Sequence, residues 1–238
     1  MSLLFEALTH PGNKRQSNED RYFVRRQDDG SLLMAVADGV GGMPGGDKAA
    51  ELAMQAIAAA ETGENITPER LFQLLMNAHD SIGYQTAAHS HLEGMGTTLT
   101  VAVARENAVF WAHVGDSRLY ILHAGALRQL TTDHRFLTSM IEHRDITEEE
   151  ARRHPLRNML DQCLGCSFLE PEQGHAVLEP GDRLLLCTDG LYEDVSHKIL
   201  EGILSADITV KQKAEQLLEV SLNAGGRDNI TFVTAEVA

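Results

Sequence analysis

The sequence predicts an α+β fold in which antiparallel sheets are covered by layers of helices. Strand-like apolar runs follow one another through very short links, which permit antiparallel neighbours and exclude parallel crossovers. Segments with helical periodicity come in pairs, one pair in the first half of the chain and one near its end. Strands in groups and helices in pairs are typical of sheets with helices on their outer faces.

The first predicted elements are a hairpin and a helix pair. The runs DRYFVRRQ and SLLMAVAD form the hairpin, with the turn signal Asp28-Asp29-Gly30 between them. Small and apolar residues recur at helical spacing over 47–61. A second helix begins at the predicted cap Thr67, with Pro68 in its first position. Its buried face is marked by five apolar residues, Leu71, Leu74, Leu75, Ala78 and Ile82.

The remaining elements are mostly strands. The runs GTTLTVAVA, AVFWAHVG, SRLYILHA and ALRQLT predict a meander, with turns at 105–107, 115–116 and Gly125. Residues 134–162 are polar and weakly periodic, which predicts a short helical insertion on the surface. The run HAVLEPGDRLLLCTD predicts a further hairpin that turns at 180–182. Two helices, at about 196–206 and 209–223, and the strand NITFVTAEV complete the prediction.

Length and composition predict one domain over residues 1–238. The chain is 43% apolar, with neither a flexible linker nor an internal repeat. The formal net charge of −15 argues against nucleic-acid binding and against anionic membranes. Both a solvated acidic surface and a set of metal ligands account for that charge. The N-terminus does not resemble a secretory signal, and no apolar run approaches the roughly 18 residues that span a bilayer. We therefore expect a soluble, cytoplasmic protein.

The chain has three cysteines, Cys163, Cys166 and Cys187. A single C-x-x-C lacks the second pair of ligands that structural zinc requires. We expect the cysteines to serve ordinary packing, and an odd number of them fits a reducing compartment.

Acidic residues stand at the ends of several apolar runs. They are Asp38 in VADG, Asp116 in VGDSR, Asp189 in CTDG, Asp228 in GGRDN, and the pair Glu19-Asp20 before YFV. A single strand-end aspartate is usually a turn former, but the whole set can gather carboxylates in one place. Such a cage of hard oxygen ligands suits Mg²⁺ or Mn²⁺, and repeated carboxylates call for more than one cation. The pattern indicates a metal-dependent enzyme that acts on a phosphorylated substrate.

Other segments resemble known nucleotide-binding and kinase motifs but do not match them. The loop GVGGMPGGDK does not fit G-x-G-x-x-G, and Asp47 stands where a phosphate-binding loop needs lysine. Its glycines are better explained by close approach of backbone to a metal. The run His143-Arg144-Asp145 mimics a kinase catalytic loop by chance, because the required asparagine is missing. We expect His113, within a strand, to be a hydrogen-bonded sheet residue and not a ligand.

The ordered set of motifs resembles the PPM/PP2C family of metal-dependent Ser/Thr protein phosphatases, and its bacterial branch most. The resemblance runs through GNKRQSNEDRYFV, VADGVGG, GMGTTLTVAV, AHVGDSRLYIL, LTTDH, ITEEEARRHPLRN, LLLCTDGLYEDVS and GGRDNITFV. It implies a four-layer αββα sandwich, with two central antiparallel sheets between helix pairs and a flap at about 134–162. It also implies hydrolysis of phosphoserine and phosphothreonine in proteins by direct attack of a metal-bridging water or hydroxide, opposing a Ser/Thr kinase.

The resemblance also implies roles for the ligands of two core Mg²⁺ or Mn²⁺ ions. Asp38 matches the carboxylate that bridges the two ions, and the carbonyl of Gly39 matches a ligand of the second. Asp189 and Asp228 match ligands of the first ion. Asp116 matches the residue that holds a weaker third ion together with Asp189.

Three further residues have implied roles. Glu19 and Asp20 match the acidic pair that holds or orients metal-bound water. Arg15 matches the arginine that grips the substrate phosphate, and a guanidinium offers planar, bidentate donors for that task. Together with Asp38, Arg15 and Asp20 are the expected catalytic residues.

Two departures from the family pattern concern the leaving-group acid and the third ion. Histidines that family members carry after the Asp-Gly are replaced here by Val40 and Met43, so the acid is open and metal-bound water is the simplest substitute. Glu193, followed by Asp194, stands where an aspartate near the third ion is expected.

Two rival functions stay open. One is a catalytically weak regulatory module that binds a partner on the same fold, and the other is a phosphohydrolase of small molecules. The core set of metal ligands is intact in the sequence, which favours a protein phosphatase.

Overall fold

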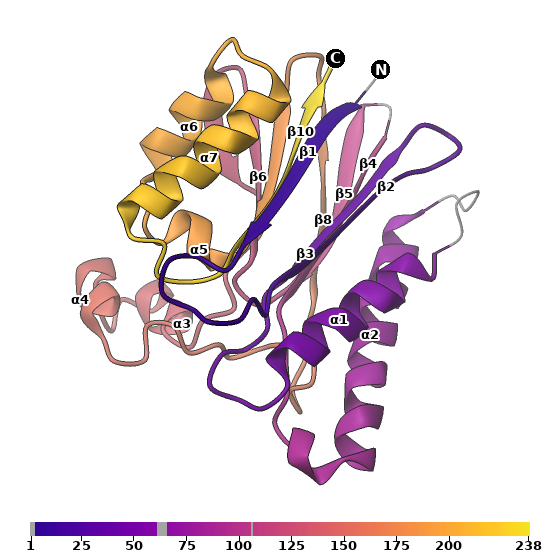
Figure 1. Cartoon of the computed structure of the whole chain (residues 1–238), viewed down its shortest axis with the longest axis vertical. Coiled ribbons are helices and arrows are strands. Elements are labelled where there is room, and N and C mark those ends of the chain that lie inside the picture. Colours follow the sequence, from indigo (N-terminus) through magenta and orange to yellow (C-terminus); the bar gives the residue numbers. More distant parts are fainter. Residues whose placement is uncertain (1–2, 61–65, 106) are drawn as a thin grey trace.

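A computed structural model describes residues 3–60, 66–105 and 107–238, and its core is a pair of stacked antiparallel sheets (Figure 1). The first sheet has the order β2 (Arg21–Arg26), β3 (Leu32–Ala37), β4 (Leu99–Arg105), β5 (Ala108–Val114), β8 (Glu172–Val177). The second has the order β1 (Leu3–His10), β10 (Ile230–Val237), β9 (Arg183–Cys187), β6 (Arg118–His123), β7 (Ala126–Gln129).

Helix pairs cover the outer faces of both sheets, giving the four layers that the resemblance implied (Figure 1). Helices α1 (Gly46–Ala58) and α2 (Pro68–Ala88) pack on the first sheet, and α6 (His197–Ser205) and α7 (Val210–Ala224) on the second. Short helices complete the fold: η1 (Ser90–Leu92), α3 (Thr138–Glu142), α4 (Glu148–Arg153) and α5 (Asp189–Tyr192). No described helix is long and apolar enough to cross a membrane.

Strand β3 shows how the sequence builds these layers. All six of its residues are buried, and their side chains alternate between two cores. Leu33 and Ala35 pack toward the helices α1 and α2, whereas Met34 and Val36 pack between the sheets. A strand that is buried on both faces needs an unbroken apolar run, and LLMAVA is one.

Most predicted elements are confirmed. The hairpin of β2 and β3 forms with its turn at Asp28-Asp29-Gly30, and Thr67 caps α2 by accepting a hydrogen bond from the Arg70 N–H. The predicted helices near the C-terminus correspond to α6 and α7, and NITFVTAEV forms β10. Glu61, at the end of the predicted helix 47–61, and Glu106, in the turn 105–107, lie outside the described residues.

Three predictions about the strands were wrong or incomplete. The predicted meander is broken, because β5 belongs to the first sheet and β6 to the second. The predicted hairpin around 180–182 is also wrong, because β8 pairs with β5 whereas β9 pairs with β6 and β10. The sequence analysis missed β1, which pairs with β10. Short links allow a chain to change sheets as readily as to fold back, so link length alone could not decide the pairing.

The insertion at 134–162, called the flap from here on, contains α3 and α4 as predicted. A capping box of Thr147 and Glu150 begins α4. The two ends of the flap are joined by backbone hydrogen bonds, from Phe136 N–H to Met159 O (2.8 Å) and from Asp161 N–H to His134 O (3.1 Å). These bonds hold the end of the flap beside the strand ends.

Candidate active site

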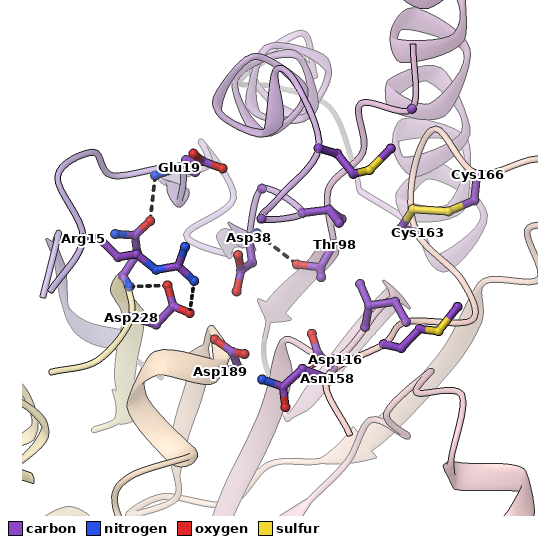
Figure 2. Close-up of a pocket in the computed structure, with 18 of the residues that line it drawn as sticks. Arg15, Glu19, Asp38, Thr98, Asp116, Asn158, Cys163, Cys166, Asp189 and Asp228 are labelled. Atoms are coloured by element: carbon purple, nitrogen blue, oxygen red, sulfur yellow. Dashed lines mark hydrogen bonds and ion pairs between the residues drawn. A yellow bond between two sulfur atoms is a disulfide. The ribbon is translucent and has the colours of Figure 1, made fainter. Parts of the chain in front are cut away.

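A pocket of about 550 Å³ opens where strand ends of the two sheets meet (Figure 2). Its floor is acidic, and four aspartates reach it from four separate segments. Asp38 directly follows β3, Asp116 lies in the link from β5 to β6, Asp189 follows β9 at the start of α5, and Asp228 precedes β10. The change of sheet between β5 and β6 therefore places Asp116 at the pocket.

Burial makes the carboxylates of Asp38 and Asp189 costly to ionise. Burial, followed by the nearby charges of Asp20 and Asp189, raises the pKa of Asp38 well above its ordinary value. Burial and the charges of Asp116 and Asp228 do the same to the pKa of Asp189. These carboxylates can ionise together only if positive charge lies beside them, and bound cations can supply that charge.

The residues present fit divalent metal ions. Asp189 Oδ1 is buried and has no hydrogen-bond partner within the described part of the chain. A buried carboxylate oxygen without a donor is costly in a folded protein, unless it serves as a ligand. The donors are carboxylate oxygens, which suit Mg²⁺ and Mn²⁺.

The backbone around Asp38 is fixed by two threonines of the neighbouring segment. The Asp38 N–H donates to Thr98 Oγ1 (2.9 Å), and Asp38 O accepts from Thr97 Oγ1 (2.8 Å) and from the Thr98 N–H (2.9 Å). Gly39 forms an isolated bridge with Thr97 and lies against α1, where an added Cβ would be 2.6 Å from Gly46 O. Sequence reasoning assigned no role to either threonine, although both lie in a quoted motif.

The two residues of the acidic pair before β2 lie in different places, Glu19 in the pocket wall and Asp20 beneath the pocket floor. Glu19 lines the pocket, and its N–H donates to Asn229 Oδ1 (2.8 Å). Asp20 is buried and does not line the pocket; its Oδ2 accepts from Thr188 Oγ1 (2.8 Å). Burial raises the pKa of Asp20 to about 6. Asp20 can therefore act on the site from behind the floor.

Arg15 lies at the mouth of the pocket, on the opposite side of Asp38 from the flap (Figure 2). Its Nη2 donates to Asp228 Oδ2 (2.7 Å), and about half of its side chain is exposed. An exposed guanidinium held at the rim can turn to a phosphate without losing much, because exposed ion pairs are weak.

An arginine from the flap forms ion pairs with two carboxylates that the family resemblance places near a third ion. Arg135 Nε donates to Asp116 Oδ2 (2.9 Å), and Arg135 Nη2 lies 2.7 Å from Glu193 Oε1. Tyr192 adds a hydrogen bond from its hydroxyl to Asp116 O (2.8 Å). Burial still raises the pKa of Asp116, although the Arg135 charge opposes that shift. Arg135 was missed in the sequence, where it follows the quoted LTTDH motif.

The flap side of the pocket is mainly apolar, with Asn158 as its polar residue. Met159 and Leu160 come from the end of the flap, and Val40 and Met43 from the loop after Asp38. Val40 and Met43 stand where the family resemblance expected histidines. Among the described residues that line the pocket there is no histidine, so no imidazole acid is available there.

The cysteine prediction was wrong for two of the three residues. Cys163 and Cys166 form a disulfide, and both line the pocket (Figure 2). Cys187 is a buried core residue, as predicted.

His113 is a hydrogen-bonded sheet residue, as expected, and a small cluster surrounds it. Its Nδ1 lies 2.8 Å from Thr100 Oγ1 and its Nε2 3.1 Å from Thr132 O, and burial lowers its pKa to about 3. His134 and Glu172 complete a group whose possible ligand atoms lie within 4.8 Å of one another. Both ring nitrogens of His113 are already hydrogen-bonded, so we assign this group no metal.

Comparisons with known proteins agree with this geometry. A family model described as Protein phosphatase 2C matches residues 11–225. The chain is 34% identical to protein phosphatase PhpP of Streptococcus pneumoniae, over 94% of this chain and 93% of that protein. It is 35% identical to Serine/threonine protein phosphatase PstP of Mycobacterium tuberculosis, but spans only 45% of that protein's length.

Solved structures give the same result. The catalytic domain of serine threonine protein phosphatase PstP, crystallised in complex with two manganese ions, superposes with a TM-score of 0.88 at 33% identity. That match covers 99% of this chain and 98% of the other. Serine/threonine phosphatase Stp1 from Staphylococcus aureus superposes with a TM-score of 0.93 at 27% identity, over 100% of this chain and 96% of that one. The acidic pocket, the four-layer fold and these matches together place the chain in the protein phosphatase 2C family.

Proposed function

We propose that this chain is a protein serine/threonine phosphatase that depends on two Mg²⁺ or Mn²⁺ ions, with residues 1–238 as one catalytic domain. The observation that carries the proposal is the set of aspartates on the pocket floor, one of which, Asp189, has a buried oxygen without a donor. Asp38, the carbonyl of Gly39, Asp189 and Asp228 would hold the two ions. Bound divalent ions supply activation of water and neutralise charge on a phosphoryl group.

The chain's own residues then bind and orient the phosphorylated side chain. Arg15 turns from Asp228 to two oxygens of the phosphate, which its planar guanidinium can reach together. Glu19, at the rim, accepts hydrogen bonds from water in the site, and Asp20 supports the floor from below. Met159, Leu160, Val40 and Met43 form an apolar wall that excludes water from one side of the reacting group.

The rival functions make different demands on this pocket. A regulatory module would not need four aspartates gathered on the floor of a cavity, where desolvation and mutual repulsion raise the pKa of Asp38 and of Asp189. A phosphohydrolase of small molecules would need several contacts to the rest of its substrate, whereas the described lining offers Arg15 as its one cation, an apolar wall and a few polar side chains, Ser17, Asn158 and Asn229. A phosphorylated side chain that enters from a protein surface fits a pocket of this kind.

The test is a set of hydrolysis assays on purified protein. With Mn²⁺ or Mg²⁺, the protein should release phosphate from p-nitrophenyl phosphate and from phosphoserine or phosphothreonine peptides, and EDTA should abolish both reactions. Full activity in metal-free buffer would sink the two-metal proposal. Efficient turnover of sugar or nucleotide phosphates, with none of phosphopeptides, would favour the small-molecule reading.

A cognate Ser/Thr kinase and a cytoplasmic role in signalling complete the proposal. The net charge of −15 disfavours nucleic acid and anionic membrane as partners. A comparison of the phosphoproteins of cells with and without the gene would identify the substrates.

A further inference from the structure

The disulfide between Cys163 and Cys166 stands in the wall of the proposed active site, and no step of the proposed reaction uses it. The Cα atoms of the two residues are 5.4 Å apart, a separation that suits a disulfide. Cys163 is 6% exposed, whereas Cys166 is partly exposed, and both line the pocket. A reagent in solution can therefore reach Cys166.

Two glycines allow the cysteine segment to lie this close to the site. Gly165 has a φ of +93°, and an added Cβ would be 2.5 Å from Met95 O. Gly96, on the facing segment, would place a Cβ 3.0 Å from Cys163 Sγ and 2.9 Å from Leu164 O. The two backbones are thus in direct contact, and the space between them admits no further side-chain carbon.

Backbone hydrogen bonds connect the cysteine segment to Asp38. The Leu164 N–H donates to Thr97 O (2.9 Å), and the Thr97 N–H donates to Leu164 O (3.2 Å). Thr97 in turn donates its hydroxyl to Asp38 O (2.8 Å) and forms the bridge with Gly39. One residue, Thr97, therefore separates the disulfide loop from the backbone of the proposed metal ligands Asp38 and Gly39.

We propose that Cys163 and Cys166 form a reversible thiol–disulfide site that controls how firmly Asp38 and Gly39 are held. With the disulfide closed, residues 163–166 form a small ring that keeps Leu164 paired with Thr97. With the disulfide open, that ring is lost, the pairing opens more often, and the metal ligands are held less firmly. The disulfide state binds the ions more tightly than the dithiol state.

The chemistry balances with a small-molecule disulfide, such as oxidised glutathione, as the oxidant. The Cys166 thiolate attacks one sulfur of the oxidant, which releases one thiol and leaves a mixed disulfide on Cys166. The Cys163 thiolate then attacks Cys166 Sγ, which closes the protein disulfide and releases the second thiol. Two thiol protons leave the protein, the cysteines are oxidised and the small disulfide is reduced. Excess reduced glutathione reverses both steps.

Such a site suits a reducing compartment as well as an oxidising one. Disulfides in cytosolic proteins are usually transient and serve catalysis or redox sensing. A purely structural disulfide would instead be needed for folding, and simple packing would leave two thiols that never pair. The experiment below separates these three possibilities.

The test compares the oxidised and the reduced full-length chain, in four steps. Mass spectrometry after alkylation should show that the Cys163–Cys166 pair opens and closes with the ratio of reduced to oxidised glutathione, without unfolding. Hydrogen exchange of the Thr97 and Leu164 amides should become about tenfold faster on reduction. The Kd for Mn²⁺, measured by calorimetry, should rise about fivefold or more on reduction. The double variant Cys163→Ala/Cys166→Ala should behave like the reduced protein and ignore glutathione.

The control is Cys187→Ala, which removes the third, buried thiol and should keep the full response. Equal exchange rates and equal Mn²⁺ affinity in the two redox states would overturn the proposal, as would a pair that never closes. A pair that cannot be reduced without unfolding would make the disulfide structural and also overturn it. The exchange measurement needs neither metal nor phosphatase activity, so it tests this inference even if the proposed function fails.

Discussion

At the scale of single residues, substitution of Asp189 shows whether this carboxylate serves catalysis or the stability of the fold. Asp189→Asn should lower kcat by orders of magnitude, because it removes a charge that would hold the ions. The metal-free variant should melt no lower than the parent, since Asp189 Oδ1 has no donor to lose and its charge is repelled by neighbouring aspartates. Hydrolysis at saturating Mn²⁺ and thermal unfolding in EDTA measure the two effects. A collapsed melting temperature in EDTA would reassign Asp189 to structure.

Arg15 tests substrate binding, measured at saturating Mn²⁺ because Arg15 also donates to the proposed metal ligand Asp228. Arg15→Ala should raise KM for phosphopeptide and reduce kcat/KM about tenfold to a hundredfold, the worth of a charge-assisted contact of roughly 1.5–3 kcal/mol. Arg15→Lys should keep only part of the parent's kcat/KM, because an ammonium group cannot donate to two phosphate oxygens in the bidentate way of a guanidinium. The matched control is Arg153→Ala on α4, an exposed arginine paired with Glu149. Unchanged kcat/KM in Arg15→Ala would remove Arg15 from the site.

Arg135 tests whether a side chain takes the place of a third ion. Arg135→Ala frees Asp116 and Glu193 together, so the variant should bind one more Mn²⁺ than the parent, weakly, in a calorimetric or spectroscopic titration. Without metal the variant should lose about 3 kcal/mol of stability, because Asp116 then lacks its buried partner. Arg135→Lys keeps a positive charge and should show smaller changes. An unaltered metal stoichiometry would mean that Arg135 does not exclude a third ion.

The site residues divide into those that motifs can identify and those that only the fold can identify. The strand-end aspartates were predictable, because carboxylates beside glycine at the ends of apolar runs form a recurrent pattern. Thr97, Arg135 and the cysteine pair were not, because each acts through a contact between distant segments. Thr97 matters only once it is known that 163–166 lies beside it.

At the scale of elements, the backbone of β8 lies very close to a side chain of β5, and a substitution can test this contact. Gly174 in β8 faces Trp111 in β5, and an added Cβ would lie 2.1 Å from the indole ring. Gly174→Ala should therefore destabilise the protein by about 1–3 kcal/mol, because the tryptophan must move within a packed core. Trp111 is the single tryptophan of the chain, so its fluorescence reports the displacement directly.

The matched control for Gly174→Ala is Gly202→Ala in α6. No atom lies within 4 Å of a Cβ added at Gly202, and alanine favours a helix over glycine by about 1 kcal/mol. Gly202→Ala should therefore stabilise the protein and leave the fluorescence unchanged. Equal effects of the two substitutions would contradict the described packing of β8 on β5.

Element types were easier to predict than element partners. Periodicity located α1 and α2, and the cap Thr67 marked the start of α2, because a helix records its buried face, and sometimes its start, in its own sequence. The pairing of β8 with β5 depends on contacts across the fold, so the local turn signal at 180–182 misled the prediction. Strand β1 was not predicted, because its partner β10 lies at the other end of the chain and no local turn signal marks the pairing.

At the scale of the whole molecule, the pH dependence of stability combines two opposite trends. The buried aspartates have raised pKa values, so the folded state holds extra protons and loses stability as pH rises; for Asp20 the window runs from about 4 to about 6. His113 has a lowered pKa of about 3, so its burial costs stability as pH falls below its ordinary 6.5. The melting temperature of metal-free protein therefore mixes both trends.

Comparing metal-loaded with metal-free protein removes the histidine contribution, because His113 neither lines the pocket nor belongs to the proposed metal ligands, so its protonation contributes equally to both states. Mn²⁺ must displace the extra protons of the aspartates, so the rise in melting temperature on adding Mn²⁺ should grow from pH 5 to pH 7. At a free Mn²⁺ concentration of 100 times Kd, the stabilisation at pH 7 should be about 2.7 kcal/mol. Asp189→Asn should reduce the Mn²⁺-induced rise in melting temperature, and the reduction should be larger at pH 7 than at pH 5. A rise that is equal at pH 5 and pH 7 would contradict proton–metal competition at these carboxylates, and would place the bound Mn²⁺ elsewhere on this strongly acidic chain.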